Sequence, residues 1–169
     1  MVVWLIGLSG SGKTTLAKKI VAGANKKLKN TVLVDGDIIR EVFGNDLGYS
    51  MDDRLLNAQR ICQIGKFLDE QGFNVACAIL SLFPETRDWN RDNIKDYYEV
   101  FIDVPIDILV DRDSKGIYAK YIKAEISDVA GMDIHFPVPE RADLVIDNSK
   151  SKDDLLAYSD SIIEKILQV

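Results

Sequence analysis

The stretch Gly7-Leu8-Ser9-Gly10-Ser11-Gly12-Lys13-Thr14 decides the fold, because it matches the phosphate-loop pattern G-x-x-x-x-G-K-[ST] at every fixed position. The apolar residues 2–6 before it predict a buried parallel strand, and residues 15–21 after it predict a helix. Glycines let consecutive backbone N–H groups point at one spot, where the helix N-terminus adds its positive end. The alternative is a plain Gly/Ser-rich turn, which the Lys-Thr pair and the preceding strand disfavour.

The fixed residues of this loop have expected roles in nucleotide binding. Residues 10–12 and Thr15 would surround the phosphates. Lys13 can reach the β- and γ-phosphates, and the Thr14 hydroxyl can ligate a metal ion. The loop therefore predicts ATP and Mg²⁺ as cofactors.

Composition and charge narrow the class of protein. A chain of 169 residues with 47% apolar residues is expected to form one domain. Its formal charge of −6 disfavours nucleic acid or an anionic membrane as a partner, and no apolar run approaches transmembrane length. Cys62 and Cys77 show no metal-binding spacing and are expected to be buried thiols, and the single His135 cannot build a zinc site alone. Because the first predicted strand begins at residue 2, we expect no signal peptide and a cytoplasmic protein.

Strands and helices alternate along the whole chain. Further strands are predicted at 30–34, 74–80, 98–103 and 144–147, and further helices at 38–43, 54–71, 106–112 and 152–167. This order predicts a single α/β domain of the P-loop NTPase type, with a parallel sheet and helices on both faces. The charged, Gly-punctuated segment 114–136 is expected to be a mobile helical segment rather than part of the core.

Acidic and basic residues follow the second predicted strand, where ligands bind to parallel sheets. Asp35 and Asp37 flank a glycine, and could accept a proton from a hydroxyl, hold Mg²⁺ through water or bind a ribose; a turn with a helix cap is the alternative. Arg40 lies on the same helical face as Asp37. Arg54, Asn57 and Arg60 recur at helical spacing on the next helix, which indicates either a solvated charged face or an anion cradle for an acceptor.

Several further motifs occur in a fixed order. They are residues 7–15, 35–37 with Arg40, 46–50 with 53–54 and Asn57, then Ser81, Arg87, Arg91, 112–120, 131–133 and 139–140. Through these motifs the chain resembles the adenylylsulfate kinase family over nearly its whole length.

The resemblance implies transfer of the γ-phosphoryl of ATP to the 3′-hydroxyl of a nucleotide ribose. It implies Asp37 as the candidate base and Lys13 as the second catalytic residue, although Asp35 at the same strand end remains an alternative base. A lid over both substrates is implied at about 113–136. Arg112 is expected at the ATP site, and the expected acceptor-binding residues are Asp35, Asp37, Arg40, Tyr49, Arg54, Asn57, Ser81, Lys115 and Val129.

The chain also departs from the family pattern, mainly where the acceptor base binds. Tyr49 keeps one of the two aromatic residues that sandwich the adenine, but Val129 stands where the family has phenylalanine. The paired arginines of the family become Gln59-Arg60, and its Ile-Ser-Pro becomes residues 80–82, Leu-Ser-Leu. Losing one stacking face weakens a purine contact by about 1–3 kcal/mol, by analogy with bases stacked on aromatic residues.

These departures indicate a relative with another acceptor, and they fit the cytidine diphosphoramidate kinase branch. We therefore expect a cytidine diphosphate derivative as acceptor, ahead of adenylyl sulfate. Rival interpretations are a nucleotide-binding switch without turnover, which would need no acceptor pocket, and a hydrolytic NTPase. The sequence leaves the oligomeric state open, with a homodimer as one alternative.

Overall fold

A five-stranded parallel sheet forms the centre of the computed structural model, which describes residues 1–168. The strands are β1 (Val2–Ile6), β2 (Thr31–Asp35), β3 (Asn74–Ile79), β4 (Tyr97–Asp103) and β5 (Leu144–Asp147), in the order β2-β3-β1-β4-β5. In the central strand, Ile6 is in register with Ile79 on one side and Phe101 on the other. The carboxyl ends of these three strands therefore lie at one edge, as predicted for a parallel sheet.

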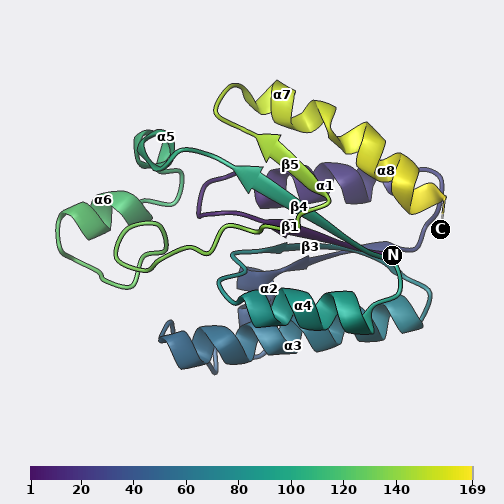
Figure 1. Cartoon of the computed structure of the whole chain (residues 1–169), viewed down its shortest axis with the longest axis horizontal. Helices are drawn as coiled ribbons and strands as arrows, with labels where there is room; N and C mark the ends of the chain where they lie inside the picture. Colours follow the sequence, from purple (N-terminus) through teal and green to yellow (C-terminus); the bar gives the residue numbers. More distant parts are fainter. Residues whose placement is uncertain (169) are drawn as a thin grey trace.

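Helices cover both faces of the sheet (Figure 1). One face carries α1 (Lys13–Ala24), α7 (Lys152–Ala157) and α8 (Ser159–Leu167), and the other carries α2 (Gly36–Val42), α3 (Met51–Glu70) and α4 (Pro84–Asn93). The two short helices α5 (Ile106–Arg112) and α6 (Ile117–Ile122) lie beyond the carboxyl ends of the strands.

The central strand β1 explains this layering, because all five of its residues are buried. Successive side chains of a strand point to opposite faces. Leu5 packs in the core cluster that contains Leu16 of α1, whereas Trp4 packs in the cluster that contains Ile61 of α3. An unbroken apolar strand of this kind needs a helical layer on each side.

The segment 114–136 was expected to lie outside the core, and this expectation is wrong for three of its residues. Tyr118, Val129 and Ala130 are 1%, 5% and 7% exposed, and the first two belong to the core cluster on the α1 face. The Tyr118 hydroxyl donates a hydrogen bond to the Ser9 carbonyl oxygen at 2.9 Å. The side chain of Tyr118 in α6 thus anchors the segment to the phosphate loop.

The predicted closing helix, 152–167, is two helices that meet at Tyr158. The Ser159 hydroxyl donates to the Leu156 carbonyl oxygen at 2.7 Å, and the Ser161 hydroxyl donates to the Tyr158 carbonyl oxygen at 3.0 Å. Serine side chains that bond back to the preceding turn compete with the helical backbone and bend the helix. Apolar periodicity alone does not reveal this break.

Both cysteines are free and buried, as predicted. Burial raises the pKa of Cys62 to about 12, so this thiol stays protonated. Within residues 1–168, every helix is too short or too polar to cross a bilayer.

Candidate active site

The phosphate loop, residues 7–14, joins β1 to α1 at the carboxyl edge of the sheet. Gly12 caps α1 with a φ of +99°, a conformation that favours glycine. A Cβ atom at this position would also lie only 2.5 Å from the Cδ2 atom of Leu155 in α7. Both the backbone conformation and the packing against α7 thus favour glycine at position 12. The loop can therefore wrap closely around the N-terminus of α1, the kind of place where phosphate binds.

Lys13 is the cation of this loop. Its Nζ donates to the Leu8 carbonyl oxygen at 2.7 Å and lies 3.4 Å from the Ser11 hydroxyl oxygen. Burial, together with the positive charge of Lys115, lowers the pKa of Lys13 to about 8. A bound polyphosphate would supply negative charge beside this ammonium, so the loop suits a nucleotide triphosphate.

The two aspartates after β2 have different surroundings. Asp35 is 7% exposed, and its Oδ2 accepts from the Thr14 hydroxyl at 2.6 Å while its Oδ1 accepts from the Asp37 backbone N–H at 3.0 Å. The side chain of Asp37 is 64% exposed, and its Oδ2 lies 2.6 Å from Lys115 Nζ. Asp35 therefore links the phosphate loop to α2, whereas the Asp37 carboxylate is open to solvent.

The Thr14 hydroxyl and the Asp35 carboxylate also form the kind of oxygen pair that Mg²⁺ prefers. Within the described residues, no group of three or more His, Cys, Asp or Glu side chains could hold a metal ion. Mg²⁺ is usually bound by one or two protein oxygens together with phosphates and water. The pair fits a magnesium ion that arrives with its nucleotide.

A cavity of about 120 Å³ lies among α2, α3 and the loop that follows β3. Its lining includes six of the predicted acceptor residues: Asp37, Arg40, Tyr49, Arg54, Asn57 and Ser81. Asn57 is buried, and its Oδ1 has no hydrogen-bond partner within the described residues. An unpaired buried amide oxygen is costly, so it indicates a group that a ligand can satisfy.

Two guanidinium groups face the ring of Tyr49 in this cavity. The Cζ atoms of Arg40 and Arg54 lie 4.9 Å and 5.6 Å from the ring centroid. Burial, and after it the positive charge of Arg40, lowers the pKa of Arg54. Two crowded cations favour an anionic ligand between or beside them.

Val129, expected as the second wall for the acceptor base, does not line this cavity; it lies in the core. The residue before it, Asp128, accepts a hydrogen bond through its backbone oxygen from Arg54 Nη2 at 2.7 Å. The segment therefore meets the cavity at Arg54, and the role of Val129 in base binding stays a prediction.

Arg112, expected at the ATP site, braces the loop that follows β5. Its Nη1 donates to the Asn148 carbonyl oxygen and its Nη2 to the Lys150 carbonyl oxygen, each at 2.9 Å. Asn148 is a residue that the sequence analysis missed: its Nδ2 donates to the Ser11 carbonyl oxygen of the phosphate loop at 2.9 Å. Its place directly after the last predicted strand is the signal that could have indicated it.

A larger cavity, of about 330 Å³, lies at the carboxyl end of β4 beneath residues 131–138. Most of its lining residues are apolar, Asp103 and His135 are its charged or titratable side chains, and it contains none of the predicted site residues. The smaller cavity, which combines Asp37 with the two arginines, is therefore the candidate acceptor site.

Comparison with known proteins identifies the family of the chain. The sequence model of the Adenylylsulphate kinase family matches residues 1–147 of the chain. The chain belongs to this family. One relative of this kinase, cytidine diphosphoramidate kinase from Campylobacter jejuni subsp. jejuni serotype O:2, is 40% identical over 165 residues, which are 98% of this chain and 95% of that protein. Another, the adenylyl-sulfate kinase of Prochlorococcus marinus, is 36% identical over 171 residues, which are 100% of this chain and 84% of that protein.

Solved structures give the same family. The APS kinase CysC of Mycobacterium tuberculosis, in complex with AMPPNP and APS, matches the kinase with a TM-score of 0.88 and 31% identity, covering 98% of this chain and 96% of that one. The predicted resemblance and fold class are confirmed. The chain is a nucleotide kinase, a phosphotransferase with a hydroxyl group as acceptor.

Proposed function

We propose that this kinase transfers the γ-phosphoryl of ATP, with Mg²⁺, to the 3′-hydroxyl of a cytidine nucleotide, with cytidine diphosphoramidate as its substrate. The observation that carries the proposal is the 40% identity, over 98% of this chain, with the Campylobacter jejuni cytidine diphosphoramidate kinase. The aliphatic Val129, at a position where the family has phenylalanine, supports it through the sequence alone, because Val129 packs in the core and does not line the cavity.

Base size gives the physical reason for this choice. Two aromatic rings line the acceptor cavity, Tyr49 and Phe83, and Tyr49 is the one that stands at a position of the family's base sandwich. Adenine has a large two-ring face and gains by stacking on both sides, whereas cytosine is smaller and loses less when one of the two stacking residues of the family is absent. The absence of the second stacking residue therefore favours the smaller base.

The diphosphate-like part of the acceptor is assigned to Arg40 and Arg54. Hydrogen bonds to backbone carbonyl oxygens hold both guanidinium groups beside Tyr49 through Arg40 Nη1 and through Arg54 Nε and Nη2. Their remaining N–H groups suit phosphate oxygens. Binding there would place the ribose toward Asp37, which lines the same cavity. Because phosphoryl transfer depends mainly on positioning and charge stabilisation, this alignment is the larger part of catalysis.

In the transfer step, the 3′-oxygen attacks the γ-phosphorus as Asp37 accepts the hydroxyl proton. The bond from the γ-phosphorus to its bridging oxygen breaks, and ADP leaves. Lys13 holds the β- and γ-phosphates, and Lys115, which pairs with Asp37 in this structure, can neutralise charge on the transferred group. Thr14 and Asp35 would hold Mg²⁺, which supplies charge neutralisation on the phosphates when bound.

Adenylyl sulfate is the second candidate acceptor. The observation that favours it is the similarity to the Prochlorococcus marinus adenylyl-sulfate kinase and to the Mycobacterium tuberculosis CysC structure, which contains APS. We further propose that the enzyme works in the cytoplasm, which its two free, buried cysteines support.

The test is a coupled ADP-release assay with ATP, Mg²⁺ and each acceptor in turn, with the product analysed by ³¹P NMR to locate the new phosphate. We expect a higher kcat/KM for cytidine diphosphoramidate, or cytidine 5′-diphosphate as its analogue, than for adenylyl sulfate. The Lys13→Ala variant is the control for contaminating kinases. A higher kcat/KM for adenylyl sulfate overturns the acceptor proposal, and ADP release that needs no acceptor would favour a hydrolytic NTPase.

A further inference from the structure

The backbone of Ser81 adopts an unfavourable conformation at the acceptor cavity. This residue lies two positions after the end of β3, lines the cavity and is 4% exposed. Its φ of +58° lies in the left-handed region, which residues other than glycine rarely adopt. Such strain persists only where the surrounding structure holds the residue in place, and it concentrates at functional sites.

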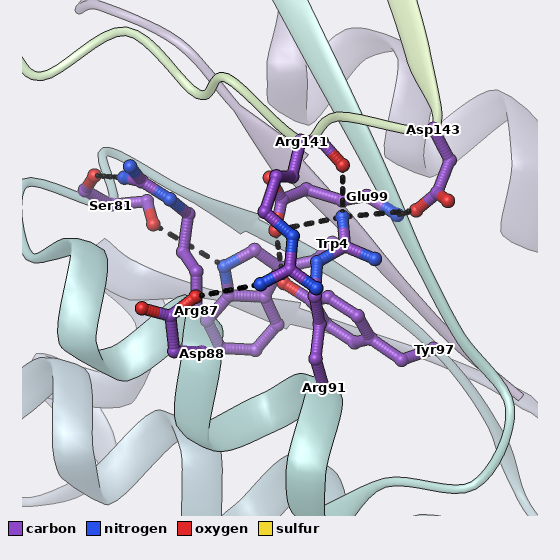
Figure 2. Close-up of polar contacts among 9 residues, drawn as sticks. All are labelled: Trp4, Ser81, Arg87, Asp88, Arg91, Tyr97, Glu99, Arg141 and Asp143. Carbon is purple, nitrogen blue, oxygen red and sulfur yellow. Dashed lines mark hydrogen bonds and ion pairs between the residues drawn. The ribbon is translucent and has the colours of Figure 1, made fainter.

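Two buried side chains hold Ser81 in this conformation, as Figure 2 shows. Arg87 Nη1 of α4 donates to the Ser81 carbonyl oxygen at 2.9 Å, and Trp4 Nε1 of β1 donates to the Ser81 hydroxyl oxygen at 3.4 Å. Both donors are buried. Because an indole N–H can only donate, the Ser81 oxygen accepts in this bond, and its own hydroxyl hydrogen is left to donate to a ligand in the cavity.

The helix that carries Arg87 is itself fixed to the sheet. One turn further along α4, Arg91 donates to the Arg141 carbonyl oxygen and forms ion pairs with Asp143 at 3.3 Å and with the buried Glu99 at 3.6 Å (Figure 2). Glu99 lies in β4 and Asp143 directly before β5. The Arg87 guanidinium is therefore held at a fixed distance from the end of β3.

We infer that Arg87 and Trp4 are positioning residues for the acceptor: they hold the strained Ser81 turn so that its hydroxyl and the adjoining backbone shape the floor of the cavity. The family resemblance includes Arg87 but assigns no function to it. The inference rests on the proposed location of the acceptor in this cavity, and it is independent of which base the acceptor carries. Neither residue touches the ATP site as assigned here, so their loss should affect the acceptor selectively.

The experiment measures KM for the acceptor, KM for ATP and kcat in the full-length enzyme, using whichever acceptor of the panel the wild-type enzyme phosphorylates with the higher kcat/KM. A wrong choice between cytidine and adenylyl acceptors therefore leaves this test intact. Arg87→Met should raise the acceptor KM about tenfold, the size expected for losing a hydrogen bond from a charged donor, with ATP KM within about twofold. Arg87→Lys keeps a donor and should give an intermediate acceptor KM.

The Ser81→Gly variant tests whether Arg87 acts by positioning Ser81 or by stabilising the whole protein. Glycine adopts a positive φ without strain, so Arg87→Met should raise the acceptor KM by less than about threefold when Ser81→Gly is already present. The matched control is Arg141→Met, which removes an exposed guanidinium that pairs with Asp88 of the same helix at 3.5 Å and should leave all three constants unchanged.

Three results overturn the inference: an unchanged acceptor KM in Arg87→Met, an equal rise in ATP KM, or the same tenfold rise in the Ser81→Gly background. Each variant is assayed well below its melting temperature. If Arg87→Met does not fold, the acceptor KM of Arg87→Lys is compared instead, in the wild-type enzyme and in the Ser81→Gly variant.

Discussion

Replacing Asp37 with asparagine separates catalysis from folding in this kinase. Asparagine keeps the size of the side chain and one acceptor oxygen, but it cannot take a proton from the 3′-hydroxyl. General-base catalysis typically contributes ~10²–10⁴-fold, so Asp37→Asn should lower kcat by that factor, which corresponds to about 3–5 kcal/mol of activation free energy.

The expected change in stability is small and can be worked out from the contacts of Asp37. Its main partner is Lys115, and both side chains are more than half exposed. An exposed ion pair contributes about 0–1 kcal/mol, which for a domain of this size is a fall in Tm of at most about 4 °C.

Asp35→Asn is the matched comparison, and it should lower Tm more than Asp37→Asn does; kcat should fall too, because Asp35 is also proposed to hold Mg²⁺. Both oxygens of the Asp35 carboxylate accept hydrogen bonds, one from Thr14 and one from the Asp37 backbone. An amide offers only one acceptor oxygen, so one donor loses its partner at a cost of about 1–3 kcal/mol. The corresponding fall in Tm is about 2–12 °C.

The assay measures kcat at saturating ATP and acceptor, together with Tm by calorimetry, for both variants. Near-wild-type kcat in Asp37→Asn, with kcat lost in an Asp35→Asn variant of unchanged Tm, would refute the assignment of Asp37 as the base.

Three further predictions concern the phosphate loop and the acceptor wall. Lys13→Ala should abolish transfer without lowering Tm, because it removes an ammonium whose pKa burial depresses; near-wild-type turnover would exclude the assigned role. The pKa of Lys13 is about 8 in the free enzyme, so its charge is lost as pH rises through that value, and ATP binding should weaken between about pH 7 and pH 9. Binding of ATP should also take up protons, which calorimetry in two buffers of different ionisation enthalpy measures. A Kd for ATP that stays constant over this pH range would contradict the prediction. Val129→Phe should shift the ratio of kcat/KM values toward adenylyl sulfate by at most about 1–3 kcal/mol, with some loss of Tm because residue 129 is packed in the core; an unaltered ratio would count against its role in base selection.

The order of strands and helices could be predicted from local patterns. Residues 2–6 form an unbroken apolar run, and in the structure they are the buried central strand. The phosphate loop could also be predicted, because its chemistry lies in eight consecutive residues whose glycines and lysine act together. The break at Tyr158 could not be predicted, because the apolar periodicity continues through it while two serine hydroxyl groups bond to the backbone there.

The functional arrangement of the acceptor cavity depends on contacts between residues far apart in the chain. Arg54 reaches the backbone of Asp128 across 74 residues, and Trp4 reaches Ser81 across 77. Such bonds form only when the parallel strands align and bring their carboxyl ends together. The sequence by itself therefore determined that this chain binds a nucleotide triphosphate and folds as a parallel α/β domain, because those properties follow from short-range pattern. Only the tertiary structure decided which aspartate is buried against Thr14 and which is open to solvent, and that Val129 packs in the core, because burial is set by the packing of separate elements.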